Sequence, residues 1–132
     1  MEIVRRAFEE FQTDGWEGRF ITFFAPEIIW DMTPSGVPGL GTYRGHAGLR
    51  AFFEDDWFAA FPLEEWEQEL VDIIDCGEKV VLIAHQRGHG SSSGASVELE
   101  YIQLCTLRDG KMVRVDTYLD RGKALEAAGL SE

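Results

Sequence analysis

The sequence predicts an α+β fold in which helices come first and a run of antiparallel hairpins follows. Apolar side chains recur with helical spacing in the first half of the chain. From about residue 66 they alternate with period two between turn signals, which is typical of strands. Helices followed by hairpins in this order are characteristic of the α+β class. The 132 residues, 45% of them hydrophobic, suit a single domain over 1–132 that buries a sizeable core.

Three helices are expected before the main run of strands. Residues 2–13 place apolar side chains on one stripe and charged ones opposite, so they predict an amphipathic helix. A shorter helix is expected over 17–25, where Pro26 stops it, because proline cannot continue a helical hydrogen-bond ladder. The third helix is expected over 46–61 and ends before Pro62.

The remaining elements follow from turn signals. Residues 28–30 predict a first strand, and the Gly- and Pro-rich segment 34–45 predicts a loop long enough to cover something. A closing helix is expected over 121–128 and stops at Gly129. Four further strands are expected between these elements, over 66–75, 79–89, 97–107 and 111–119.

Composition excludes several classes of partner. The chain has 12 basic and 24 acidic residues, and the resulting net charge of −12 repels phosphate backbones and anionic membrane surfaces. We therefore expect neither nucleic acid nor a membrane as a partner. No apolar run approaches the ~20 residues that span a bilayer, and Cys76 and Cys105 lack the spacing of a redox or zinc site. A cytoplasmic setting is the expectation.

No cofactor and no metal are expected. The chain contains neither a Gly-x-Gly-x-x-Gly nor a Walker-type loop. His85 and His89 have the spacing of a helical zinc pair, but on a strand they would lie about 13 Å apart, which is too far to share one ion. The acidic residues of 54–56 and 64–75 are interpreted as a solvated surface, because the ligand spacing of a calcium loop is missing.

Period-two alternation sorts the strand residues into two faces. In the hairpin formed by 79–89 and 97–107, a register that places His89 opposite Glu98 and Arg87 opposite Glu100 pairs opposite charges. That register leaves the inner face apolar with a few neutral polar groups, and the charged face outside.

The last hairpin has two possible turns, and they place opposite faces inward. A two-residue Asp-Gly turn would bring Asp116 and Tyr118 to the inner face. A three-residue Arg-Asp-Gly turn with a glycine bulge would instead bring inward Val113, Val115, Thr117 and Leu119. The second turn is expected, because it keeps the charged side chains out of the core.

Several segments in this order resemble the SnoaL-like branch of the nuclear transport factor 2-like superfamily, which has the ketosteroid isomerase and polyketide cyclase fold. They are FAPEIIW at 24–30, YRGH at 43–46, LRAFF at 49–53, RDGKM at 108–112 and YLD at 118–120. The resemblance covers nearly the whole chain. It implies a curved antiparallel sheet wrapped by N-terminal helices, a cone-shaped α+β barrel, with an internal apolar pocket.

The same resemblance argues against the activities best known in the superfamily. The tyrosine, the aspartate base and the protonated aspartate of its ketosteroid isomerases match Phe8, Met32 and Gln103, none of which can do the same job. The tyrosine, asparagine and last-strand aspartate of the related epoxide hydrolases match Trp30, Met32 and Thr117. No reaction is therefore predicted.

The leading functional hypothesis is that the pocket binds a small apolar molecule, with aromatic rings supplying contact and neutral polar groups orienting it. The expected lining residues are Phe8, Trp30, Met32, Phe53, Trp57, Gln86, Tyr101, Gln103 and Thr117. One alternative is an isomerase- or cyclase-like enzyme that uses Asp31 or Asp116 for proton transfer. Another is an association module with a vestigial pocket.

A homodimer is the expected assembly. Four apolar side chains are assigned to the outer sheet face, where a monomer would leave them in contact with water. They are Val81, Ile83, Ile102 and Leu104. Dimers joined through this face are also what the resemblance implies.

Overall fold

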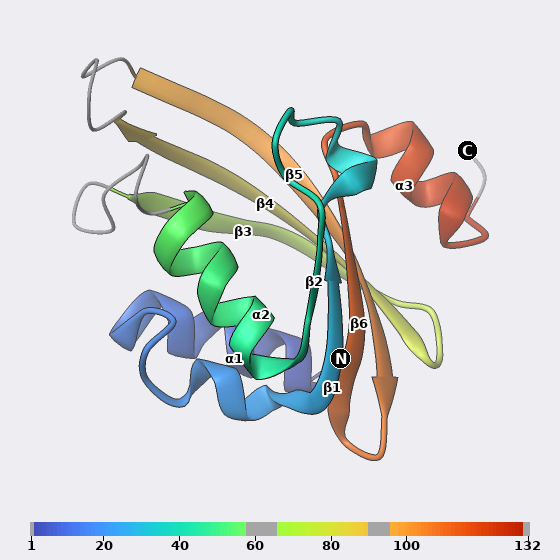
Figure 1. Ribbon diagram of the computed structural model, residues 1–132. Helices are drawn as coiled ribbons and strands as arrows, with labels where there is room; N and C mark the ends of the chain where they lie inside the picture. Colours follow the sequence, from blue (N-terminus) through green and yellow to red (C-terminus); the bar gives the residue numbers. More distant parts are fainter. Residues whose placement is uncertain (1, 58–65, 90–95, 131–132) are drawn as a thin grey trace.

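The computed structural model describes residues 2–57, 66–89 and 96–130. Its centre is a curved sheet of six strands in the order β2-β1-β6-β5-β4-β3. Figure 1 shows the sheet curving over α1 and α2, with α3 on the opposite side. The strands are β1 (Phe24–Asp31), β2 (Thr42–Arg44), β3 (Glu67–Asp75), β4 (Lys79–His89), β5 (Ser96–Arg108) and β6 (Lys111–Tyr118). The predicted α+β class is confirmed.

The helical segments are shorter and more varied than expected. The α-helices are α1 (Glu2–Asp14), α2 (Gly45–Ala51) and α3 (Arg121–Ala127). The helix expected over 17–25 is a 3₁₀ segment, η1 (Arg19–Phe23), because the chain is already extended at Phe24. The third expected helix changes to a π-helix, η3 (Phe52–Trp57), and its predicted end lies outside the described residues.

The sheet is mixed, because β1 runs parallel to β6 while the other neighbouring strands are antiparallel. A wholly antiparallel sheet was expected, so this pair is a correction. The register between β1 and β6 shifts between Phe24 and Ile29. Pro26 lies in that irregular stretch, where a residue without a backbone N–H is tolerated.

The segment 34–45 is mostly a loop, as expected, but it ends in an additional strand. β2 pairs with β1 and places Tyr43 opposite Trp30. A short 3₁₀ segment, η2 (Thr33–Ser35), begins the loop. The loop therefore leaves the end of β1 and returns alongside the same strand.

β4 and β5 pair in a register two residues away from the expected one. The predicted pairs, His89 with Glu98 and Arg87 with Glu100, are wrong. Glu98 instead lies opposite Arg87, and Glu100 opposite His85. Both registers place cationic or ionisable groups beside the glutamates, so charge pairing does not discriminate between them. A shift of two residues keeps every side chain on its predicted face.

The last hairpin closes with a two-residue turn, which corrects the three-residue turn that was expected. Arg108 pairs with Lys111. The two residues between them, Asp109 and Gly110, have φ angles of 53° and 79°. Positive φ at both positions is the signature of a type I′ hairpin turn.

A β-bulge beside this turn restores the predicted strand faces. The register shifts between Thr106 and Leu107, which leaves Val113 on β6 without a partner residue on β5. Beyond the bulge, Thr117 lies opposite Gln103. The expected parity of β6 is therefore reached by a different route, with a short turn followed by one extra residue.

The outer face of the sheet is covered by α3, which corrects the expectation that its apolar patch is exposed. Ala124 of α3 packs with a cluster whose members are each at most 4% exposed: Val81, Ile83, Ile102 and Leu104. These four side chains are buried within the monomer, so their exposure no longer argues for a homodimer. Homodimerisation itself stays a prediction.

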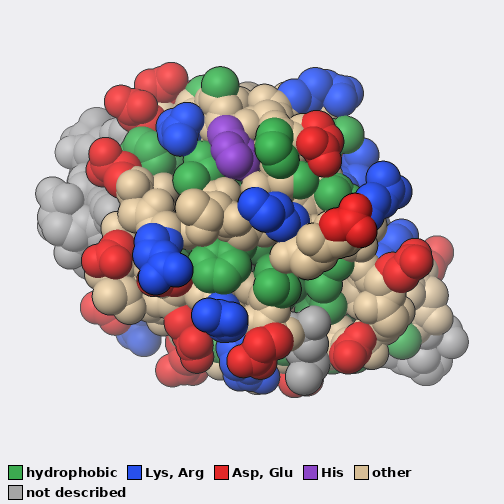
Figure 2. Space-filling view, turned by 90° about the horizontal axis from the view of Figure 1, so that it is seen from below, with side chains coloured by type: hydrophobic (Ala, Val, Ile, Leu, Met, Phe, Trp, Pro, Cys, Tyr) green, Lys and Arg blue, Asp and Glu red, His purple; other side chains and the backbone are tan. Residues whose placement is uncertain are grey.

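Charged side chains lie on the outside of the molecule. On the face drawn in Figure 2, acidic and basic side chains are interspersed with hydrophobic ones. None of the described helices combines the length and the apolar character that crossing a bilayer requires.

Candidate functional site

A cavity with a volume of about 100 Å³ lies between the concave face of the sheet and the helical segments. All nine residues expected to line a pocket contribute to its wall: Phe8, Trp30, Met32, Phe53, Trp57, Gln86, Tyr101, Gln103 and Thr117. The structure thus brings these residues together around one space. Their assignment as ligand contacts is a separate proposal.

Aromatic rings form much of the wall. Phe53 lies at the centre of this group, with ring centroids 5.5 Å from Phe11, 5.6 Å from Phe20 and 5.6 Å from Trp30. The π-helical turn contributes Phe52, Phe53 and Trp57 to the lining. Such turns widen the helix locally and are frequent at functional sites.

Neutral polar groups interrupt the apolar wall on the sheet side. The hydroxyl of Tyr101 donates to Oε1 of Gln68 at 3.1 Å. The side-chain nitrogen of Gln103 lies 3.4 Å from Oγ1 of Thr117, which is long for a hydrogen bond. Gln86, only 7% exposed, also lines the cavity. These groups offer both donors and acceptors to a molecule in the cavity.

Trp30 carries an unsatisfied donor. The residue is 5% exposed, and its buried indole nitrogen, Nε1, has no hydrogen-bond partner among the described residues. A buried donor left without a partner costs about 1–3 kcal/mol. Trp30 also lines the cavity, so this unsatisfied donor belongs to a residue of the cavity wall.

Among the described lining residues, none carries a charge at neutral pH. The titratable groups in the wall are Tyr101 and Cys105. Burial raises the pKa of the Tyr101 hydroxyl, with a further contribution from Cys105. Burial, followed by the negative charge of Asp116, raises the pKa of the Cys105 thiol to about 12. Both groups therefore stay protonated, and the wall has no obvious general base.

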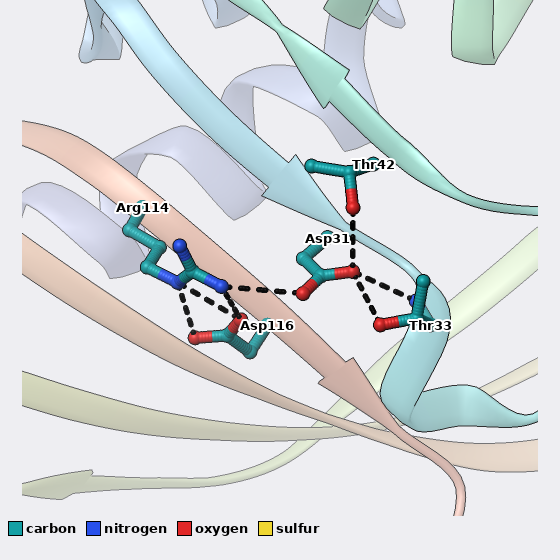
Figure 3. A network of polar contacts seen from close by, with 5 residues as sticks. All are labelled: Asp31, Thr33, Thr42, Arg114 and Asp116. Carbon is teal, nitrogen blue, oxygen red and sulfur yellow. Dashed lines mark hydrogen bonds and ion pairs between the residues drawn. The ribbon is translucent and has the colours of Figure 1, made fainter.

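Asp31 and Asp116, the two candidate bases, do not line the cavity. They project from the other face of β1 and β6 and share a guanidinium between them (Figure 3). Nη2 of Arg114 lies 3.2 Å from Asp31, and its Nε lies 3.0 and 3.1 Å from the two oxygens of Asp116. The bulge that turns Thr117 inward is what turns Asp116 outward.

Asp31 also fastens the loop that follows β1. Its Oδ1 accepts hydrogen bonds from the backbone and the hydroxyl of Thr33, and from the hydroxyl of Thr42 (Figure 3). Burial alone would raise the pKa of Asp31, but these hydrogen bonds and Arg114 outweigh it and hold the pKa below the ordinary 3.8. Ser35 and Val37 of this loop line the cavity. Asp31 therefore supports the wall without contacting the interior.

Some lining residues were not predicted. Phe11, Phe20 and Phe24 line the cavity but were not among the residues expected to do so. Met112 takes the place on the inner face that was expected for Val113, which is the bulged residue. Helical and strand periodicity identifies these side chains as buried, but it cannot separate filled core from cavity wall.

No metal-binding group is found in the described part of the chain, where no three His, Cys, Asp or Glu side chains gather as ligands would. His85 lies beside a carboxylate, with Nε2 3.2 Å from Glu98. His89 occupies the end of β4, opposite Ser96. The prediction that the two histidines share no ion stays a prediction.

Comparisons with known proteins agree with this architecture. A family model described as a SnoaL-like domain matches residues 4–115. No curated protein gives a significant match.

Three solved structures illustrate the likeness. A nuclear transport factor 2-like protein of unknown function from Burkholderia pseudomallei has 23% identity and a TM-score of 0.74, with 96% of this chain and 94% of that chain covered. A protein assigned as a SnoaL-like polyketide cyclase from Jannaschia sp. has 24% identity and a TM-score of 0.73, covering 96% and 88%. A hypothetical protein with a ketosteroid isomerase-like fold from Catenulispora acidiphila, in complex with trimethylamine, has 17% identity and a TM-score of 0.72, covering 98% and 93%. At these identities the likeness concerns the fold.

Proposed function

The chain belongs to the SnoaL-like domain family, and on that premise we propose that its cavity binds a compact, uncharged and mostly apolar small molecule. One observation carries the proposal. Every described side chain of the wall is apolar or neutral, and the space between them is not filled by the protein. A concave, mostly apolar wall with a few polar groups is the usual character of a small-molecule site.

The volume favours a small ligand. An engineered apolar cavity of about 150 Å³ binds benzene, and the cavity here measures about 100 Å³. A molecule built on one ring is therefore a better match than one of steroid size.

The lining favours an uncharged ligand. Burying an ion without a partner of opposite charge is strongly unfavourable, and no described lining residue supplies such a partner. The faces of aromatic rings also attract cations, but more weakly than a carboxylate does. A small amine is therefore the ligand class to compare with an uncharged one. One relative of this fold was solved in complex with trimethylamine.

The two other hypotheses have less support. Proton transfer by Asp31 or Asp116 would require a carboxylate that reaches the bound molecule, whereas both carboxylates bind Arg114 on the other face of the sheet. An association module would use the outer sheet face, and α3 occupies that face within the same chain.

The test is a titration of the full chain with α-methylstyrene and, separately, trimethylamine, followed by the indole N–H signals of the tryptophans in NMR spectra. Saturable shifts with α-methylstyrene and weaker ones with trimethylamine are expected. A larger response to the amine would reverse the proposed ligand class, and no response to either would remove the binding proposal.

A matched pair of variants tests whether the probe occupies the cavity. Ala7 is 3% exposed and lines the cavity, so Ala7→Leu fills part of the space. Ala47 is exposed on α2, so Ala47→Leu adds the same atoms outside. Binding of α-methylstyrene should weaken about tenfold or more in the first variant, because overpacking competes with the ligand, and stay unchanged in the second. Equal affinities in both variants would place the probe elsewhere.

A further inference from the structure

Resting on the proposed function, we infer that Trp30 orients the ligand by donating its indole N–H to an uncharged oxygen of the bound molecule. The ligand class then narrows to compact apolar compounds that carry a carbonyl or similar acceptor. Trp30 becomes a residue that determines specificity at this site.

The inference starts from the unsatisfied donor. Nε1 of Trp30 is buried and has no partner among the described residues, although buried polar groups in folded proteins are nearly always hydrogen-bonded. The rings packed around the indole are Phe24, Phe52 and Phe53, with centroids 6.1, 5.6 and 5.6 Å away. Phenylalanine offers only its ring face, and an N–H over a ring face is a weak interaction.

The strand register places Trp30 near the polar residues of β6 and β5 that line the same cavity. Trp30 lies opposite Val115 in the parallel pair, and Thr117 is the next inward residue on β6. Thr117 in turn contacts Gln103 at 3.4 Å, a separation loose enough for either group to turn toward a ligand. An oxygen between Trp30 and Thr117 would therefore meet more than one donor.

Two probes of nearly the same shape separate this inference from simple apolar binding. Acetophenone carries a carbonyl oxygen where α-methylstyrene carries a methylene group. The measured quantity is the ratio of their two dissociation constants, so that the general apolar contact cancels. The ratio is determined by calorimetry for the full chain, for Trp30→Phe and for Trp16→Phe. Trp16 stacks on Phe53 but is not part of the cavity wall, so it is the matched control.

Trp30→Phe should shift the ratio against acetophenone by about 3- to 10-fold, the range expected for one net hydrogen bond. Trp16→Phe should leave the ratio as it is in the unmodified chain. In NMR spectra of the unmodified chain, acetophenone should move the Trp30 indole proton signal downfield, and α-methylstyrene should not. That reading does not depend on the folding of a variant.

The possible outcomes separate the role of Trp30 from the binding function of the cavity. If both probes bind, and neither the ratio nor the Trp30 signal distinguishes them, the role of Trp30 is overturned while the binding function stands. If neither probe binds at millimolar concentration, the proposed function fails and the role of Trp30 fails with it.

Discussion

Arg114 on β6 donates to the carboxylate of Asp31 on the neighbouring parallel strand β1, with Nη2 and Oδ2 3.2 Å apart. Asp31 lies directly opposite Asp116, so two carboxylates stand side by side on the outer face of the sheet. They would repel each other without a cation between them. Arg114 binds both, which makes this group a link between β1 and β6 rather than a catalytic pair.

The first prediction concerns the contribution of Asp31 to stability. Asp31→Ala removes the acceptor for Thr33, Thr42 and Arg114, and should lower the free energy of unfolding by about 1–3 kcal/mol, the usual cost of unsatisfied partners. Urea denaturation measures the change. Asp72→Ala is the control and should have little effect, because within the described residues the Asp72 side chain bonds only the adjacent backbone N–H of Ile73. Equal losses in the two variants would contradict the assigned role.

The second prediction is a pH dependence. The pKa of Asp31 is lower in the folded chain than its ordinary 3.8, so the folded state favours the carboxylate. The resulting stabilisation is present above about pH 4 and is lost as the pH falls through the lowered pKa. The stability difference between the unmodified chain and Asp31→Asn should therefore shrink between pH 7 and pH 2.5. If the stability difference grew on acidification, the pKa of Asp31 would be raised by folding rather than lowered.

The third prediction concerns the two thiols. Cys105 is 1% exposed and its pKa is raised to about 12, whereas Cys76 is half-buried. Since the thiolate is the reactive form, iodoacetamide at pH 8 should alkylate Cys76 first and leave Cys105 protected until the chain unfolds. In Cys76→Ser, mass spectrometry measures the alkylation of Cys105 alone. Rapid alkylation of Cys105 in that folded variant would mean that the cavity wall opens readily.

The fourth prediction concerns the contact between Gly88 and Trp66. A Cβ atom at position 88 would lie 2.6 Å from Cε3 of the Trp66 ring, so Gly88→Ala must displace a residue of the cavity wall. We expect a loss of about 1–3 kcal/mol, as for other overpacked sites, and weaker binding of α-methylstyrene. Gly41→Ala is the control, because a Cβ atom there meets nothing within 4 Å. Thermal denaturation of both variants provides the comparison.

The fifth prediction concerns α3. Ala124 is 1% exposed against the outer sheet face, so Ala124→Asp places a charge among Val81, Ile83 and Ile102. The charge should detach α3 and expose the patch, because an unpaired buried carboxylate is strongly unfavourable. Sedimentation velocity should then show more self-association than in Ala127→Asp, which changes an exposed residue of the same helix. An unchanged distribution would mean that α3 does not shield this face.

The sequence by itself determined the α+β class, the order of the main helices and strands, and the face on which most strand residues lie. These features depend on local periodicity, which can be read correctly even where the register between two strands is predicted wrongly. The shift of two residues between β4 and β5 left every face unchanged, since side chains alternate with period two. For the same reason the strand residues among the predicted lining, Trp30, Gln86, Tyr101, Gln103 and Thr117, meet around one cavity.

Only the tertiary structure decided how the non-local parts combine. Turn chemistry around Asp109 allowed either parity for β6, and the bulge at Val113 set it, so that Thr117 faces the cavity and Asp116 does not. The apolar outer face indicated that something covers it, but not whether α3 or a second copy does. Apolar burial is non-directional, so a hydrophobic pattern specifies that a face is covered and leaves its partner to the assembled fold.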